Sequence, residues 1–177
     1  MQKKSFNHKL LTPHFSLLEM TESRTAKKHG IGNVPSELEV KNLRQLCQCT
    51  LEPLREALQL PVVITSGYRC KALNDIISHH SNRSQHMAGQ AADFYVGWSA
   101  ALSGKGKSGG EDPSPRERLI RAFRHIIQHL DYDQLILYPN FIHVSFVSPA
   151  TNRHYIMTAN GKGHYRRISK EVALAMS

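Results

Sequence analysis

The sequence predicts an α+β fold in which helices flank a small, mostly antiparallel sheet. Apolar residues recur at helical spacing over 36–58 and 116–130. Runs of β-branched and aromatic residues, which favour strands, occupy 61–65 and 91–96. Two further runs, QLILY and FIHVSF, are separated only by Pro139-Asn140, as in a hairpin. Strands grouped in this way, between and after helices, indicate an α+β fold rather than a doubly wound one.

The N-terminal part is predicted to be helical. A short helix is expected over Thr21–Lys28, closed by Gly30. Ser36 begins the next helix as its N-cap, with Glu39 as the capping-box partner. One face of this helix carries Leu43, Leu46, Cys47, Thr50, Leu51, Leu54 and Leu58. Because proline has no backbone N–H to donate, Pro53 is expected to kink or divide the helix.

The middle of the chain alternates short elements with loops. In order, we expect a buried strand at 61–65, a Ser66-Gly67 turn, a short helix at 70–77, a polar loop at 78–85 and a strand at 91–96. Residues 98–114 are rich in Gly, Ser and Lys. Such a composition buries too little apolar surface to offset the entropy of ordering, so a mobile surface loop is predicted there.

The C-terminal part begins with a helix over 116–130, whose apolar stripe includes Phe123. The hairpin follows, then a strand candidate at 154–158 and a short helix at 169–176. No internal repeat is present, and no Gly-rich phosphate loop of standard spacing. The chain is interpreted as a single domain over 1–177, with a core at about 14–158 and a basic C-terminal tail.

Composition narrows the possible partners. The chain has 177 residues, 40% of them hydrophobic, and a net charge of +9. Such a charge favours an anionic partner: nucleic acid, an acidic cell-wall polymer or an anionic membrane surface. The three cysteines form neither a disulfide framework nor a CxxC zinc pair. The sequence does not indicate an oligomeric state.

The hydrophobic segments are too short for membrane insertion. The N-terminus has early lysines but no apolar run of signal-peptide length, and no segment approaches the roughly 20 apolar residues of a membrane span. The expectation is a chain that is cytoplasmic as synthesised. Action at the cell wall or in the periplasm then requires another export route or a missing leader.

Three side chains suggest a metal site on the sheet face. His86 lies just before the 91–96 strand, Asp93 within it, and His143 within the hairpin. If these strands are neighbours, side-chain alternation allows Asp93 and His143 to meet on one face, and a turn at Gly89 brings His86 to them. Two imidazoles and one carboxylate are the protein ligands of a catalytic zinc, which keeps its fourth position for water. The alternative is that His143 is an ordinary core histidine of an apolar strand, and that His86, one of eleven histidines in the chain, has no metal role.

Three sequence blocks resemble a known family. ITSGYRCKALN (64–74), SQHMAGQAAD (84–93) and DQLILYPNFIHVSF (133–146) are similar in order and spacing to the zinc D-Ala-D-Ala carboxypeptidases, peptidase M15, which include endolysin-type peptidases. The likeness spans roughly residues 14–147 and is nearest to the small single-domain carboxypeptidase branch. The SxHxxGxAxD pattern is its most specific part.

The resemblance implies a role for each matching residue. His86, Asp93 and His143 correspond to the ligands of one Zn²⁺ ion. Arg69 corresponds to an arginine that stabilises the substrate carbonyl or carboxylate, which suits its guanidinium; the alternative is an arginine that pairs with a neighbouring carboxylate. Ser84 corresponds to a substrate-contacting serine, although a turn-forming serine is equally consistent with the sequence.

The acidic general base is where the sequence departs from the family. Relatives carry an acid three residues before the last histidine ligand, where this chain has Asn140, or in the DQLIxE stretch, where it has Tyr138. Tyr138 is therefore assigned to substrate binding. Asp133 is retained and is the candidate catalytic carboxylate; a structural role for it, or a base from the His79-His80 loop, is the alternative.

The resulting prediction is a zinc metallopeptidase that hydrolyses peptidoglycan stem peptides as a carboxypeptidase or endopeptidase. The alternative is a zinc-loaded but catalytically weak module that binds cell-wall peptide or a protein. Nucleic-acid binding follows only from the charge and the basic HYRRISK segment, because the chain has no recognised nucleic-acid motif.

Overall fold

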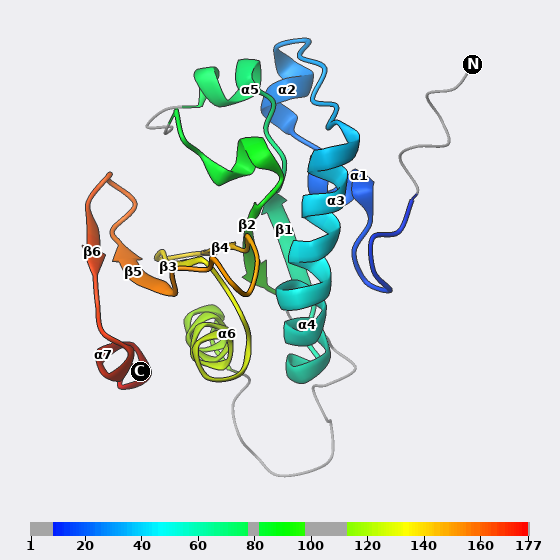
Figure 1. Cartoon of the computed structure of the whole chain (residues 1–177). Helices are drawn as coiled ribbons and strands as arrows, with labels where there is room; N and C mark the ends of the chain where they lie inside the picture. Colours follow the sequence, from blue (N-terminus) through cyan, green and yellow to red (C-terminus); the bar gives the residue numbers. More distant parts are fainter. Residues whose placement is uncertain (1–8, 78–81, 98–112, 177) are drawn as a thin grey trace.

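A computed structural model of the chain describes residues 9–77, 82–97 and 113–176 (Figure 1). It confirms the α+β fold. Strands from both halves of the chain join one six-stranded sheet in the order β1-β2-β4-β3-β5-β6. The strands are β1 (Val62–Ser66), β2 (Ala91–Val96), β3 (Gln134–Leu137), β4 (Ile142–Ser145), β5 (Tyr155–Ala159) and β6 (Tyr165–Arg167).

The sheet is mostly antiparallel, as expected. Only the β3–β5 pair is parallel among the described strands. The predicted hairpin forms between β3 and β4, and its turn is closed by a hydrogen bond from the Tyr138 N–H to the Phe141 carbonyl. Strand β6 lies in the segment that the sequence analysis assigned only to a basic tail. Its three residues are exposed, so no apolar alternation marked it.

The helices are α1 (Leu17–Thr21), α2 (Arg24–Lys28), α3 (Glu37–Leu46), α4 (Glu52–Leu58), α5 (Lys71–Ile76), α6 (Pro115–His129) and α7 (Lys170–Leu174). A single helix over Thr21–Lys28 was wrong, because Ser23 caps the Ala26 N–H and starts α2 separately from α1. Pro53 does divide the next helix: a π-helical segment, Cys47–Leu51, precedes α4. The predicted capping box of Ser36 with Glu39 is present.

Most of the predicted mobile loop at 98–114 falls outside the described residues. Its last residue, Ser114, caps α6 and forms a capping box with Glu117. None of the described helices combines the length and the apolar character that crossing a membrane requires.

The two faces of the sheet differ in character. Helix α6 packs against β2 and β3, and the side chains that join the hydrophobic core from the central strands are Ala92, Phe94, Val96, Leu135, Leu137, Ile142 and Val144. Side chains alternate along a strand, so Asp93 and His143 project from the opposite face. The core thus holds one face of the sheet in place, and the polar side chains converge on the other.

Candidate metal centre

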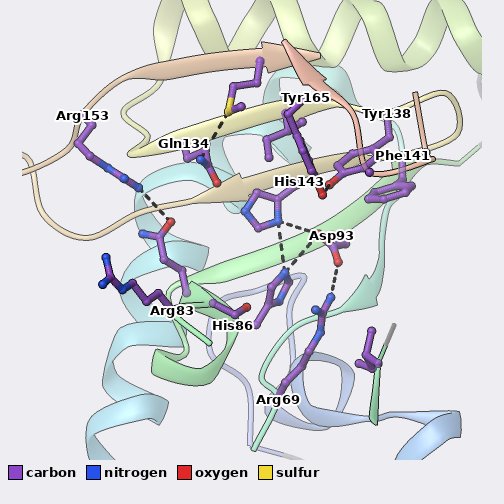
Figure 2. A pocket seen from close by; sticks show the side chains of 17 residues that line it. Arg69, Arg83, His86, Asp93, Gln134, Tyr138, Phe141, His143, Arg153 and Tyr165 are labelled. Atoms are coloured by element: carbon purple, nitrogen blue, oxygen red, sulfur yellow. Dashed lines mark hydrogen bonds and ion pairs between the residues drawn. The ribbon is translucent and has the colours of Figure 1, made fainter. Parts of the chain in front are cut away.

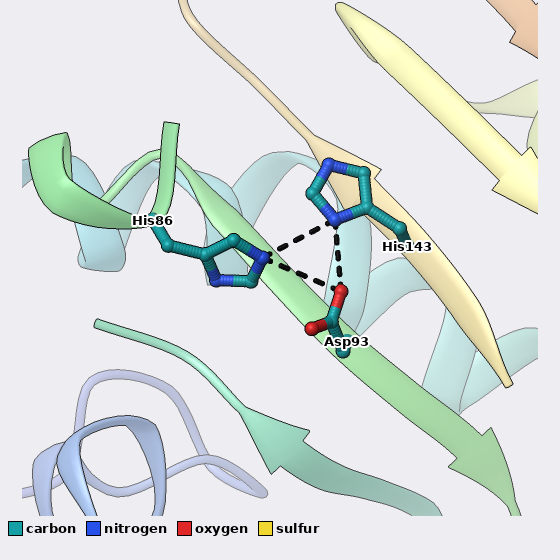
Figure 3. A group of neighbouring side chains, drawn as sticks. All are labelled: His86, Asp93 and His143. Atoms are coloured by element: carbon teal, nitrogen blue, oxygen red, sulfur yellow. Dashed lines mark hydrogen bonds and ion pairs between the residues drawn. The ribbon is translucent and has the colours of Figure 1, made fainter. Parts of the chain in front are cut away.

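Three side chains converge on the polar face of the sheet (Figure 3). His86 Nε2 lies 3.3 Å from Asp93 Oδ1 and 3.3 Å from His143 Nδ1. His143 Nδ1 lies 2.8 Å from Asp93 Oδ1. One atom from each residue therefore points to a common centre, and these three residues are the group of possible metal ligands found among the described residues.

Local structure places each of the three. Asp93 and His143 are direct register partners across the antiparallel β2–β4 pair, so their side chains leave the same face side by side. His86 lies in a short 3₁₀ helix, Gln85–Ala88, that ends immediately before β2. The sequence interpretation, in which neighbouring strands bring Asp93 and His143 together and His86 folds over them, matches this arrangement.

The geometry fits a tetrahedral zinc ion. Ligand atoms about 2.0–2.1 Å from zinc stand about 3.3 Å apart at the corners of a tetrahedron. Two of the three separations here are 3.3 Å and the third is 2.8 Å. The site would leave the fourth corner open, as in catalytic rather than structural zinc sites.

Hydrogen bonds outside this group orient the ligand atoms. His86 Nδ1 lies 2.7 Å from the Gly67 carbonyl, which accepts its hydrogen and leaves Nε2 as a lone-pair donor to a metal. Arg69 Nη2 donates to Asp93 Oδ2 at 2.7 Å, so Oδ1 is the oxygen that faces the histidines. Arg69 Nε in turn donates to Ser66 Oγ at 2.8 Å.

His86 and Asp93 both favour the protonation state that binds a metal. Burial lowers the pKa of His86 and outweighs the attraction of Asp93, so its imidazole is neutral. Burial by itself raises the pKa of Asp93, but His86 and His143 outweigh it and hold the pKa well below its ordinary value. Zinc binds neutral imidazole and ionised carboxylate, so neither group has to change its charge.

Two glycines allow the backbone to pack closely around His86. Gly89 ends the 3₁₀ helix with φ = +67°, and a Cβ there would lie 2.5 Å from the Glu39 carbonyl oxygen. At Gly67, whose carbonyl holds His86, a Cβ would lie 2.3 Å from the Met20 carbonyl oxygen. The tight turn predicted at Gly89 is confirmed.

Gly89→Ala is expected to lower both stability and metal affinity. The left-handed conformation alone costs about 1–2 kcal/mol for a residue with a Cβ, and relief of the clash moves the His86 segment away from α3. Thermal melting and zinc titration measure the two effects. Gly30→Ala is the matched control, because Gly30 has φ = +64° but open space around its Cβ position; equal zinc affinities in the two variants would contradict this account.

The three ligand candidates lie in an open pocket of about 700 Å³ (Figure 2). Three of the residues predicted from the sequence, Arg69, Ser84 and Tyr138, line it as well. Other lining residues were not anticipated: Arg83, Gln85, Gln134, Phe141, Arg153, Met157 and Tyr165. Several of these lie beyond residue 147, where the family resemblance ends.

Asp133 lies beneath the pocket and is not among its lining residues. Its carboxylate is buried and accepts hydrogen bonds from Arg153 Nε at 2.9 Å, the Arg153 backbone N–H at 3.0 Å and Gln85 Nε2 at 2.9 Å. Gln85 directly precedes His86. Through these bonds, Asp133 connects the loop before β5 to the segment that carries His86. This arrangement corresponds to the structural alternative for Asp133.

Asp133→Asn is expected to lower the free energy of unfolding by about 1–3 kcal/mol. Removing one partner of a buried ion pair costs more, but Arg153 is half-exposed and solvent screens the pair. Burial raises the pKa of Asp133, and the bonds from Arg153 and Gln85 outweigh it and lower the pKa. The stabilisation is therefore present above the unfolded pKa of about 3.9 and is lost as the pH falls through the lower folded value.

Denaturant melts of both proteins between pH 2 and 7 test this prediction. Wild type should lose stability at the acid end more steeply than Asp133→Asn. Unchanged stability with lost turnover would instead identify Asp133 as the catalytic base.

No carboxylate other than Asp93 lines the described part of the pocket. Tyr138 is a lining residue, whereas Asn140 is exposed in the β3–β4 turn and is not. The His79-His80 loop lies outside the described residues. Of the two positions where relatives carry acids, the structure thus places only Tyr138 beside the ligands.

A family model described as Peptidase M15 matches residues 13–103. The matched segment is slightly more than half of the chain and includes Arg69, Ser84, His86 and Asp93. His143 lies beyond it. A comparison with curated proteins gave no match.

Proposed function

The chain belongs to the peptidase M15 family, and from this premise we propose that it is a zinc-dependent metallopeptidase of the small D-Ala-D-Ala carboxypeptidase or endolysin-like branch. Its proposed substrates are the stem peptides of peptidoglycan. The observation that carries the proposal is the convergence of His86 Nε2, Asp93 Oδ1 and His143 Nδ1 at the edge of an open pocket.

Zinc bound by these atoms would lower the pKa of a water to about 7 and polarise the scissile carbonyl. The chain supplies the rest of the site. Gly67 and Arg69 hold the ligand atoms in orientation; His86 is neutral and Asp93 is ionised. The open pocket has a volume of about 700 Å³, which is within the range typical of ligand-binding sites.

Arg69 is proposed to serve two roles. One Nη2 hydrogen is used on Asp93 and Nε on Ser66, and a guanidinium has five N–H groups. Because Arg69 also lines the pocket, remaining N–H groups can stabilise the negative charge that develops on the substrate carbonyl oxygen. In this proposal both sequence interpretations of Arg69 hold, because Arg69 pairs with Asp93 and also lines the pocket.

The charge of the site supports an anionic substrate. Arg69, Arg83 and Arg153 line the pocket; Arg69 is paired with Asp93 and Arg153 with the buried Asp133, so these five described side chains carry a net charge of +1 (3 − 2). Stem peptides carry free carboxylates, and the net charge of +9 favours the acidic wall as a whole. Ser84, at the start of the 3₁₀ helix, is proposed to contact the substrate.

A second candidate function is a zinc-loaded module that binds wall peptide, or a protein, with little turnover. The observation in its favour is that Tyr138 occupies a pocket position where relatives carry an acid. General base catalysis is typically worth roughly 10²- to 10⁴-fold, so its loss slows hydrolysis while leaving the ligand set in place.

Metal analysis of the purified protein, together with mass spectrometry of muropeptides before and after incubation, tests both candidates. One equivalent of zinc with new peptide products supports the peptidase. Zinc with binding of muropeptides but no products supports the module. Protein that takes up no zinc would overturn both candidate functions.

A further inference from the structure

The C-terminal hairpin β5–β6 forms one wall of the pocket. Met157 of β5, Tyr165 of β6 and two glycines of the connecting turn, Gly161 and Gly163, are lining residues. This hairpin lies outside residues 13–103 that match the family model and beyond the 14–147 span of sequence resemblance. The family resemblance therefore assigns no role to this part of the pocket.

The position of Tyr165 is fixed by the sheet. Strand β5 pairs in parallel with β3, with Leu137 opposite Thr158, and this brings the hairpin next to the end of β3 where Tyr138 follows. Tyr165 pairs with Ala159 across the hairpin. Gly161 and Gly163, with φ of +76° and +81°, allow the turn between them.

The hydroxyl groups of Tyr165 and Tyr138 are hydrogen-bonded to each other in the pocket (Figure 2). The Tyr138 hydroxyl donates to that of Tyr165 at 3.1 Å, and the two rings meet edge to face at 90°. Phe141 stacks on Tyr138 with 4.1 Å between ring centroids, which holds the Tyr138 ring in place. Tyr165 is the more exposed of the two residues, at 49%, whereas Tyr138 is half-buried.

Tyr138 lies within electrostatic reach of the candidate ligand Asp93. Burial, then the bond to Tyr165 and then the charge of Asp93, raise the pKa of Tyr138 well above its ordinary value. The Tyr138 phenol therefore keeps its hydrogen at neutral pH. Each phenol hydroxyl has one hydrogen, and Tyr138 donates its own to the Tyr165 oxygen. The Tyr165 hydroxyl can therefore donate its hydrogen to an acceptor outside the pair.

We propose that Tyr165 is a substrate-binding residue, whose hydroxyl donates a hydrogen bond to an oxygen of the bound peptide next to the scissile bond. The inference rests on the proposed peptidase function and adds a subsite contributed by the C-terminal hairpin. The acceptor is either the terminal carboxylate of the peptide or an internal amide carbonyl. Tyr138 positions the Tyr165 hydroxyl, and Phe141 positions Tyr138.

The test compares Tyr165→Phe with wild type on two synthetic stem peptides that end in D-Ala-D-Ala, one with a free terminal carboxylate and one with a terminal amide. The change removes one oxygen and keeps the ring. Tyr155→Phe is the matched control: it removes the hydroxyl of another tyrosine of the same hairpin, which is stacked between Arg153 and Arg167 and is not among the lining residues.

The expected result for Tyr165→Phe is a kcat/KM about 10-fold lower, mostly through KM, with unchanged zinc content and melting temperature. A loss confined to the carboxylate peptide identifies the terminal carboxylate as the acceptor, and equal losses identify an internal carbonyl. Wild-type kinetics for Tyr165→Phe on both peptides, or an equal loss in Tyr155→Phe, would overturn the proposal.

The outcome also separates this inference from the proposed function. If zinc-loaded wild type hydrolyses neither peptide, the D-Ala-D-Ala carboxypeptidase form of the proposed function fails. Calorimetric binding of the uncleaved carboxylate and amide peptides to wild type and Tyr165→Phe then tests the subsite alone. Weaker binding by Tyr165→Phe supports the subsite, and equal binding, or none by wild type, overturns it.

Discussion

If the chain is a zinc peptidase as proposed, replacing His143 by alanine is expected to abolish both zinc binding and peptide hydrolysis. His143 Nδ1 is one of three converging ligand atoms, and the remaining pair, His86 Nε2 and Asp93 Oδ1, cannot complete a three-ligand catalytic site. Without the metal, the attacking water returns from a pKa of about 7 towards 15.7. We therefore expect turnover to fall by more than roughly 10³-fold, together with loss of zinc measured by atomic absorption.

Two further variants make this result interpretable. His86→Ala should lose zinc as well, but it also leaves the Gly67 carbonyl without its hydrogen bond, so its melting temperature should fall more than that of His143→Ala. His129→Ala is the matched control, because His129 is exposed at the end of α6 and is not a lining residue of the pocket. Full zinc and full activity in His143→Ala would exclude the three-ligand centre.

The central strands were predictable from their runs of β-branched and aromatic residues and from the short Pro139-Asn140 connection. Side-chain alternation along a strand then predicted that Asp93 and His143 share one face of the sheet. Capping boxes at Ser36 and Ser114 mark the starts of the two longest α-helices. The first was predicted, whereas the second fell in a stretch whose composition suggested only a loop.

The surroundings of the site were less predictable, since they depend on contacts between distant segments. Gln85, Arg153 and Asp133 come from three separate parts of the chain, and their network has no local signature. Tyr165 lies in a short exposed strand with no apolar alternation, so its segment was interpreted only as basic. The parallel pairing of β5 with β3 places Tyr165 at the pocket. This pairing joins segments that are distant in the sequence, so no local pattern predicts it.

The sequence lacks the family's acidic residue at two positions, and the sequence alone could not say which of them faces the substrate. Relatives carry acids where this chain has Tyr138 and Asn140. The structure separates them: Tyr138 lines the pocket beside the candidate ligands, whereas the Asn140 side chain is exposed in the β3–β4 turn. A carboxylate is therefore expected to act on the zinc-bound water only from position 138.

Tyr138→Glu is accordingly expected to raise kcat about 10- to 100-fold over wild type, and Asn140→Glu to leave it unchanged. A phenol with a raised pKa cannot accept the proton of the attacking water at neutral pH, and a glutamate can. The gain stays at the low end of general base catalysis, because Tyr138→Glu also removes the hydroxyl partner of Tyr165 and the ring that stacks on Phe141. KM should rise for the same reason.

Steady-state kinetics of zinc-loaded wild type, Tyr138→Glu and Asn140→Glu on one stem peptide decide the matter. A gain in Asn140→Glu alone would mean that the β3–β4 turn, not the end of β3, presents the base to the substrate. If wild type is already fast and neither variant gains, then another group accepts the proton, and slow turnover is not a property of this site. If only Tyr138→Glu gains, the missing carboxylate limits a centre whose metal ligands and substrate pocket are otherwise in place.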